Sequence, residues 1–215
     1  MRKLVSHGVC FLALTLTATA QPLRFGQAAV SITPPDGMPF QVPQRPPFPV
    51  IVATGTHDPL HAKAVVFESG GVKAAIVSCD LTSIPIDLIR AARAHVAKIS
   101  RVPPENVMIT ATHTHTVPNI RPRFFANASP AQKKVAMEYL ERLPKLIAES
   151  VQLAEQALTV ATLRAAIAHV PDVAFNRRFL MKDGTVVSNP AKGQDELLVN
   201  VVRPAGPTDP ALPML

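Results

Sequence analysis

Two apolar stretches with a helical pattern between them constrain the fold of this chain more than any other feature. Residues 72–81 form a near-continuous apolar run, which is typical of a strand buried on both faces. Pro85 then opens a segment with apolar residues at helical spacing, which ends before residues 102–104. Residues 107–112 predict a second strand. This order predicts a βαβ unit with parallel, adjacent strands, and hence an α/β fold with a mixed, partly parallel sheet flanked by helices.

The rest of the chain predicts shorter strands and one long helix. Residues 60–67 form a strand, and the turn at residues 68–71 joins it to the next strand as a hairpin. Ser129 and Pro130 predict the start of a helix that runs to about residue 158 and is kinked or divided by Pro144. The remaining predictions are strands at 28–33, 163–170 and 197–202, a turn at 182–185, a loop at 119–128, and a proline-rich, extended surface segment at 34–49.

The amino terminus has the three parts of a secretory signal peptide. Arg2 and Lys3 precede an apolar run, and small residues precede Gln21, so we expect residues 1–20 to be cleaved. The mature chain, residues 21–215, is then expected to be secreted or periplasmic. Its formal charge falls from +7 to +5, without a basic run interleaved with aromatic residues. This pattern speaks against nucleic acid as a partner and leaves contact with an anionic membrane surface open.

The most specific chemical motif is His113-Thr114-His115, which follows the second strand of the βαβ unit. Two histidines two positions apart on a strand project from the same face, and imidazole is both a common metal ligand and a proton-transfer group. Asp80 ends the first strand, and adjacent strands lie about 4.8 Å apart. Asp80 is therefore expected to reach the histidines, as an acceptor for an imidazole N–H or as a second metal ligand. Histidines that only satisfy hydrogen bonds in the core or cap the strand are the alternative.

Further residues near these strands each have two interpretations. Cys79 is interpreted as a buried small hydrophobic residue rather than a catalytic thiol, because reactive thiols need partial exposure. His57 lies in a turn from which it could reach the site. Arg177 and Arg178 follow Asn176 in a polar segment. They form either a solvated turn or a clamp for an anion or amide oxygen, since guanidinium offers a rigid fork of donors.

Several short motifs occur in an order that resembles a known family. The sequence is similar to the N-terminal catalytic region of neutral/alkaline, non-lysosomal ceramidases, and the resemblance covers nearly the whole mature chain. Its most specific part is the His-Thr-His-x-x-Pro motif in its strand context. The segments that carry the resemblance are Ile32-Thr33-Pro34-Pro35, Gly55-x-His57, Leu60-His61-Ala62-Lys63-Ala64, Val77-Ser78-Cys79-Asp80, His113-Thr114-His115-Thr116-x-Pro118, Asn176-Arg177 and Asn189-Pro190.

The resemblance implies a secreted zinc amidohydrolase that cleaves the N-acyl bond of ceramide and releases sphingosine and a fatty acid. It assigns His113 as a Zn²⁺ ligand. It places His115 beside the zinc, where this residue helps bind substrate, and it places Arg177 in the lining of the catalytic site. The partner implied is a ceramide-like lipid, with peripheral contact to a membrane surface.

The sequence also departs from the family pattern. Thr116-Val117 stands where the family usually has Ser-Gly, and Arg178-Phe179 stands where it has Ser-Pro. The other zinc ligands of the family, a histidine, a glutamate and a tyrosine, come from further along a much longer chain. Residues 21–215 are therefore expected to form a ceramidase-like α/β domain that is incomplete at its carboxyl end. The alternatives are a related secreted amide or ester hydrolase, and a truncated, non-catalytic lipid-binding remnant.

Overall fold

The structure is a computed structural model that describes residues 21–40, 50–190 and 198–215. The chain divides into two compact units, Met1–Ala161 and Thr162–Leu215. The predicted signal peptide, residues 1–20, lies outside the described residues.

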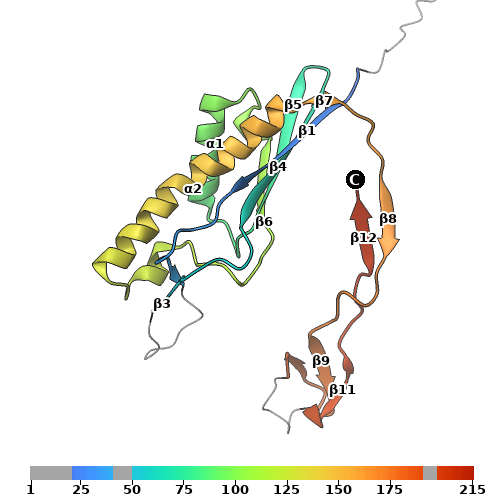
Figure 1. Cartoon of the computed structure of the whole chain (residues 1–215). Coiled ribbons are helices and arrows are strands. Elements are labelled where there is room, and N and C mark those ends of the chain that lie inside the picture. Colours follow the sequence, from blue (N-terminus) through green and yellow to red (C-terminus); the bar gives the residue numbers. More distant parts are fainter. Residues whose placement is uncertain (1–20, 41–49, 191–197) are drawn as a thin grey trace, which may run out of the picture. The chain divides into compact units, whose positions relative to one another are not determined.

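The first unit contains a five-stranded mixed sheet (Figure 1). The two predicted strands of the βαβ unit pair in parallel, and the first of them forms the predicted antiparallel hairpin with the strand before it. Gly70 and Gly71 close that hairpin with positive φ angles. The strand order is β6-β5-β4-β1-β7, with β1 at Arg24–Ser31, β4 at His61–Ser69, β5 at Val72–Cys79, β6 at Val107–Ala111 and β7 at Thr159–Val160. The predicted α/β class with a partly parallel sheet is therefore confirmed.

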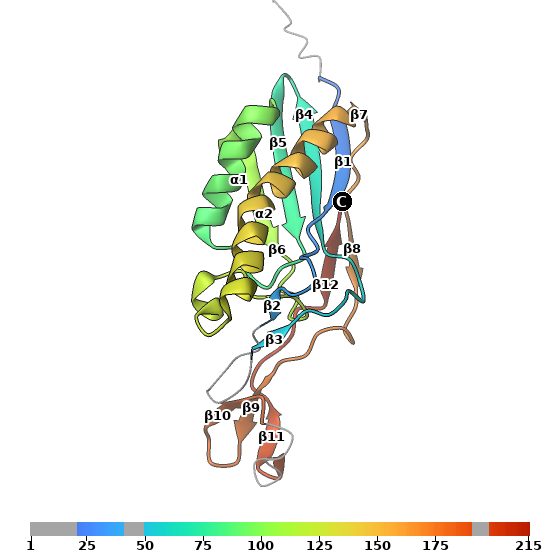
Figure 2. The same cartoon turned by 60° about the vertical axis from the view of Figure 1, so that its left-hand side comes forward.

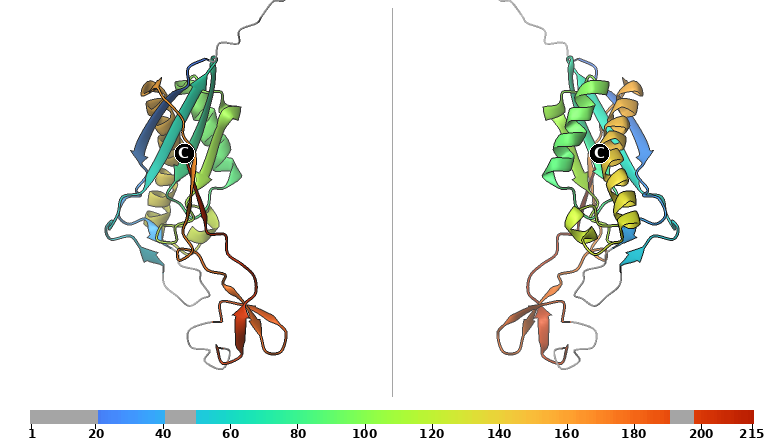
Figure 3. Two further views of the ribbon diagram at one scale, coloured as in Figure 1. Left: turned by 90° about the vertical axis from the view of Figure 1, so that its right-hand side faces the viewer. Right: turned by 90° about the vertical axis from the view of Figure 1, so that its left-hand side faces the viewer.

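Two helices cover one face of this sheet. In Figure 3 one view has the sheet in front of both helices, and the opposite view has both helices in front. Helix α1 (Ile86–Ile99) begins after Pro85, as predicted. Helix α2 (Pro130–Gln156) begins at a capping box, because Ser129 accepts from the Gln132 backbone and the Gln132 side chain accepts from the Ser129 backbone. Pro144 is buried within α2 and does not divide it.

The prediction that the first βαβ strand is buried on both faces was wrong. Along β5 burial alternates, with Ala75, Val77 and Cys79 buried and Ile76 41% exposed. Its neighbour in the register, Met108, is 58% exposed. The reason is that α1 and α2 both pack on the same face of the sheet. Successive side chains of a strand point to opposite faces, so Ile76 and Met108 point to the face that these helices do not cover. Figure 2 shows the two helices side by side over the strands.

Helix α2 packs closely on β1 at a glycine. A Cβ atom on Gly26 would clash with the carbonyl oxygen of Ala154, and it would lie 2.9 Å from the backbone of both Ala157 and Leu158. Gly26 is the residue that lets the helix backbone approach the strand. Tyr139 of α2 is buried in the core, and its hydroxyl donates to the carbonyl oxygen of Ile32 at 2.7 Å.

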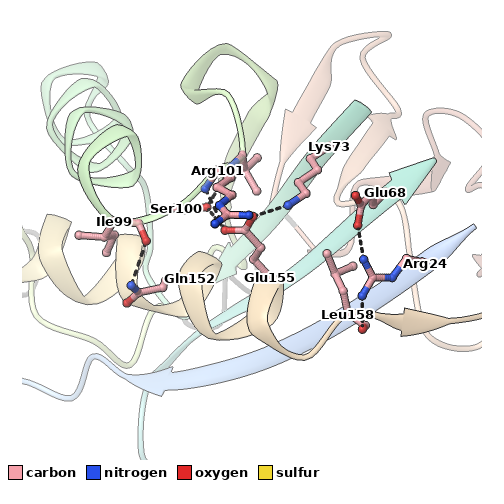
Figure 4. Close-up of polar contacts among 10 residues, drawn as sticks. Arg24, Glu68, Lys73, Ile99, Ser100, Arg101, Gln152, Glu155 and Leu158 are labelled. Carbon is pink, nitrogen blue, oxygen red and sulfur yellow. Dashed lines mark hydrogen bonds and ion pairs between the residues drawn. The ribbon is translucent and has the colours of Figure 1, made fainter. Parts of the chain in front are cut away.

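A polar network joins the sheet and both helices at the end where β5 begins (Figure 4). Lys73 Nζ lies 2.5 Å from Glu155 Oε1, and the Ser100 hydroxyl and the Arg101 backbone N–H donate to Glu155 Oε2 at 2.8 and 2.9 Å. Burial raises the pKa of Glu155, but the hydrogen bonds from Lys73, Arg101 and Ser100 outweigh it and hold this pKa below its ordinary value. At the same end Arg24 donates to Glu68 and to the carbonyl oxygen of Leu158.

The proline-rich segment differs in part from its prediction. Strand β2 (Pro39–Phe40) pairs with β3 (Ile51–Val52), and Met38 and Pro39 are buried. The backbone pairing of Met38 with Ala53 turns these residues inward, so this part belongs to the core and not to the surface. Residues 41–49 lie outside the described residues. The described part of the unit also contains two short 3-10 helices, η1 at Pro104–Asn106 and η2 at Pro122–Phe125, the second within the predicted loop.

The second unit consists of small antiparallel sheets. The predicted turn at residues 182–185 is confirmed, because Asp183 accepts from Thr185 and Gly184 has a positive φ. The predicted strand at 163–170 is shorter, and the one at 197–202 is shifted, since Leu198 is helical and residues 199–200 form a turn. The strands are β8 (Ala166–His169) paired with β12 (Ala211–Met214), and β9 (Arg178–Met181) between β10 (Val186–Ser188) and β11 (Val201–Pro204).

Candidate functional site

The histidine loop begins where β6 ends, at the carboxyl end of the parallel strand pair. The Thr112 N–H donates to the carbonyl oxygen of Cys79 at 2.9 Å, and the His113 N–H donates to that of Leu81 at 3.0 Å. The backbone after β6 therefore stays bonded to the backbone after β5. The histidine loop therefore lies at the end of the parallel strands where the sequence placed it, and ligand sites in α/β sheets gather at this end.

The two histidines lie close together, but not for the reason that the sequence suggested. Strand β6 ends at Ala111, so neither His113 nor His115 is on a strand. His113 instead has a φ of 62°, in the left-handed region, and this turn brings the two rings to 4.8 Å between centroids at an interplanar angle of 82°. Both residues are exposed. A left-handed φ is uncommon for residues other than glycine and accumulates at functional sites.

One hydrogen bond fixes which ring nitrogen of His113 carries a proton. Its Nδ1 lies 2.6 Å from the carbonyl oxygen of Thr82. A carbonyl oxygen only accepts, so Nδ1 must donate, and Nε2 of a neutral ring is left with its lone pair. Metal-bound histidines share this arrangement, because the ring nitrogen that does not bind the metal usually donates to a carbonyl or a carboxylate.

Asp80 lies near this loop but its carboxylate makes other contacts. Its Oδ2 accepts from the backbone N–H of His61 at 3.0 Å and lies 3.4 Å from Lys63 Nζ. In the part of the chain that the structure describes, no three His, Cys, Asp or Glu side chains are grouped as a metal would need. The described residues therefore bring His113 and His115 together, and Asp80 does not join them as a third donor.

A pocket of about 620 Å³ lies beside the histidine loop. Asp80, Thr114 and Thr116 contribute to its wall, and so does the segment from Ile51 to Leu60. Its lining combines apolar side chains, including Phe40, with threonine hydroxyls, a composition that suits a ligand with both apolar and polar parts.

His57 also lines this pocket. Its Nδ1 lies 2.9 Å from Asp58 Oδ2, and its side chain is 98% exposed. A contact between two side chains this exposed contributes little to stability.

Two further residues with titratable side chains, Cys79 and Tyr139, are buried in the core. Cys79 is buried, and burial, with a smaller contribution from Asp80, raises the pKa of its thiol to about 12. The prediction that Cys79 is a buried residue is therefore confirmed. Burial likewise raises the pKa of Tyr139 above its usual range, and this hydroxyl is bonded to backbone.

Arg177 belongs to the second unit, where a structured turn holds its backbone. Asn176 Oδ1 accepts from the Arg178 N–H at 2.9 Å, and Asn176 Nδ2 donates to the carbonyl oxygen of Gly206 at 3.0 Å. The carbonyl oxygen of Arg177 accepts from the Asn189 N–H at 2.7 Å. The side chains of Arg177 and Arg178 are exposed. The two motifs Asn176-Arg177 and Asn189-Pro190 are thus neighbours in space, which their separation in the sequence did not reveal.

Sequence reasoning missed the contribution of Thr82. Its carbonyl oxygen receives the His113 ring, and its Oγ1 donates to the carbonyl oxygen of Thr114 at 2.8 Å. The available signal was its position two residues after Asp80, in the loop that follows the first parallel strand.

The fold of this chain is similar to that of bacterial neutral ceramidase. The neutral ceramidase from Pseudomonas aeruginosa matches with a TM-score of 0.60 over 73% of this chain and 25% of that chain, at 22% sequence identity. A ceramidase complexed with C2 gives a TM-score of 0.58 with the same identity and coverage. This chain thus spans about a quarter of the length of those structures, and the likeness is one of fold. No family model and no curated protein matches the sequence.

None of the helices in the described residues is both long enough and apolar enough to cross a membrane.

Proposed function

We propose that this chain is part of a zinc-dependent amidohydrolase of the neutral ceramidase type, which hydrolyses the N-acyl amide of a ceramide-like lipid. The observation that carries the proposal is the pair His113 and His115 at the carboxyl end of the parallel strands, with Nδ1 of His113 already donating to a carbonyl. The similarity of the fold to neutral ceramidase supports it.

The described residues supply one zinc ligand in this proposal, His113. Imidazole is a common zinc ligand, and a catalytic zinc site needs three protein ligands and an open position for water. His113 would bind the metal through Nε2. The remaining ligands would come from residues other than the two histidines. Bound zinc would lower the pKa of its water to about 7 and so supply a nucleophile at neutral pH.

His115 has the role of a substrate-binding and proton-transfer group in this proposal. Its ring lies edge-to-face with that of His113 and is exposed. An imidazole at this place would stabilise the charge that develops on the amide oxygen, or move a proton to the leaving nitrogen. Asp80 and the threonines of the pocket wall would hold the polar head of the lipid by hydrogen bonds.

The family resemblance implies that Arg177 lines the catalytic site, and the proposal gives its guanidinium the role of a clamp for the amide oxygen. Its test is Arg177→Ala, with Arg178→Ala as the matched control because both side chains are exposed and adjacent. We expect the first change to lower kcat/KM for ceramide hydrolysis by about 10-fold or more, and the second to leave it nearly unchanged. Equal losses in both variants would remove Arg177 from the site.

The main experiment measures zinc content and amide hydrolysis together in the full-length protein. Elemental analysis would give the zinc content, and mass spectrometry would follow fatty acid release from ceramide. We expect His113→Ala to lose more than about 100-fold in zinc affinity, above the 10- to 100-fold typical of outer partners of metal ligands. We expect His115→Ala to keep zinc and lose turnover. The control is His95→Ala, on helix α1.

Each alternative predicts a different result of the same experiment. Zinc with hydrolysis of other amides or esters, but not of ceramide, would favour a related hydrolase. Lipid binding that survives His113→Ala, without turnover in either protein, would favour a non-catalytic lipid-binding remnant. Absence of zinc together with absence of amide hydrolysis would overturn the proposal. Secretion or a periplasmic location, and contact with a membrane surface, belong to the proposal and follow from the predicted signal peptide and the lipid substrate.

A further inference from the structure

We propose that Thr82 is a positioning residue of the histidine site. It holds His113 in one backbone conformation and one ring tautomer. The metal-binding consequence of this inference rests on the proposed function, whereas its structural part does not. Thr82 follows β5, and its two oxygen atoms contact the two residues His113 and Thr114 of the loop after β6.

The first contact orients the ring. The carbonyl oxygen of Thr82 lies 2.6 Å from Nδ1 of His113, so it selects the tautomer that carries the proton on Nδ1. The contact also constrains the orientation of the ring, because its Nδ1–H must point at this oxygen. Nε2 is then the atom that a metal can bind, without a change of tautomer beforehand.

The second contact holds the backbone. Oγ1 of Thr82 donates to the carbonyl oxygen of Thr114 at 2.8 Å, on the other side of His113 in the sequence. The His113 N–H donates in turn to the carbonyl oxygen of Leu81 at 3.0 Å. Three hydrogen bonds with Leu81 and Thr82 therefore hold the chain on both sides of His113. They surround its positive φ, a conformation that a non-glycine residue keeps only when its surroundings enforce it.

The threonine side chain is the part of this arrangement that a substitution can test. Thr82→Val keeps the shape and the backbone carbonyl but removes the hydroxyl, whereas Thr82→Ser keeps the hydroxyl. Thr110→Val is the matched control, because Thr110 is a half-buried threonine on the neighbouring strand β6. In the metal-free, full-length protein, nitrogen-15 NMR of the imidazole at a pH where the ring is neutral reports the tautomer. Titration with Zn²⁺ against a chelating dye reports affinity.

We expect wild type, Thr82→Ser and Thr110→Val to show the Nδ1-protonated tautomer of His113. Thr82→Val loses the bond from Oγ1 to Thr114, so the loop no longer holds the His113 ring against the retained Thr82 carbonyl. We therefore expect this variant to populate both tautomers and to bind Zn²⁺ about 10-fold more weakly, at the lower end of the range for outer partners of metal ligands. An Nε2-protonated ring in the wild type would overturn the inference even if Thr82→Val failed to fold. So would a Thr82→Val protein whose tautomer and affinity match the wild type. A wild type with the expected tautomer that binds no zinc would instead contradict the proposed function and leave the structural role of Thr82 standing.

Discussion

The two ends of the five-stranded sheet in the first unit are built differently. At the end where β5 begins, Glu155 is held by Lys73, Ser100 and the Arg101 backbone, and its side chain is 12% exposed. At the other end, where β5 and β6 finish, His113 and His115 are exposed and the backbone at His113 is in the left-handed region. One end has its polar groups paired with each other, and the other presents imidazoles to solvent.

The difference indicates a division between stability and function. The Glu155 network joins both helices to the sheet, so its loss should loosen the whole unit. The histidine loop contacts mainly the backbone after β5, so changes there should alter ligand binding more than folding. Ligand sites at the carboxyl ends of parallel strands follow the same logic, because the loops there vary while the sheet supports them.

The largest effect on stability is expected from Gly26→Ala. The added Cβ would clash with the carbonyl oxygen of Ala154 in α2, and backbone cannot move aside as a flexible side chain can. We expect a loss of about 3 kcal/mol or more in the free energy of unfolding, at the upper end of the range for overpacked sites. Urea unfolding followed by circular dichroism measures it. A loss below about 1 kcal/mol would show that α2 and β1 are further apart than described.

The next effect is expected from Glu155→Gln, which keeps the shape and removes the charge. The half-buried ammonium of Lys73 would lose its partner, and we expect a loss of about 2 kcal/mol in the free energy of unfolding. Glu68→Gln is the control, because Arg24 is more exposed and this pair is worth less than about 1 kcal/mol. Zinc affinity should change in neither variant. A drop in zinc affinity in Glu155→Gln alone would break the proposed separation of the two ends.

Acid should act through the same carboxylate. The pKa of Glu155 is lower in the folded protein than its ordinary value of 4.5, so the folded state binds fewer protons than the unfolded state. The stability that Glu155 contributes is therefore complete above pH 4.5 and is lost as the pH falls through the folded-state pKa. Urea midpoints measured from neutral to acid pH should fall more in the wild type than in Glu155→Gln. Parallel curves for both proteins would contradict this assignment.

The smallest effect that we expect is a difference in stability between two substitutions of His113. His113→Ala and His113→Gly both remove the ring and its bond to Thr82, but only alanine keeps a Cβ at a φ of 62°. We expect the glycine variant to be more stable than the alanine variant by about 1 kcal/mol, because glycine adopts positive φ without strain. Thermal unfolding of both variants measures this difference. A glycine variant less stable than the alanine variant would mean that the loop does not hold His113 in that conformation.

The elements that the sequence predicted best are those with a local chemical cause. Ser129 and Pro130 mark a helix start because a hydroxyl cap and a fixed φ act within one turn, and the capping box is present in the structure. Lys182–Thr185 forms a turn for a similarly local reason. The βαβ order also held, because handedness and connection length leave few ways to join two parallel strands.

The predictions that failed depended on distant partners. Residues 72–81 were expected to form a strand buried on both faces, but both helices pack on one face of the sheet, and Ile76 is exposed. Met38 was expected at the surface, and its pairing with Ala53 buries it. The bond from the His61 backbone to the Asp80 carboxylate is another contact between distant residues that the sequence did not reveal, and the role of Asp80 beside the histidines stays a prediction.

By itself the sequence determined that this chain has a parallel strand pair with His113 and His115 at its carboxyl end, because strand and helix periods are local properties of the residues. Only the tertiary structure decided how those histidines are presented. The bond from Nδ1 of His113 to the Thr82 carbonyl, and the left-handed turn that it accompanies, join two loops 31 residues apart. No periodicity reports such a contact, because it exists only after the two strands have paired side by side.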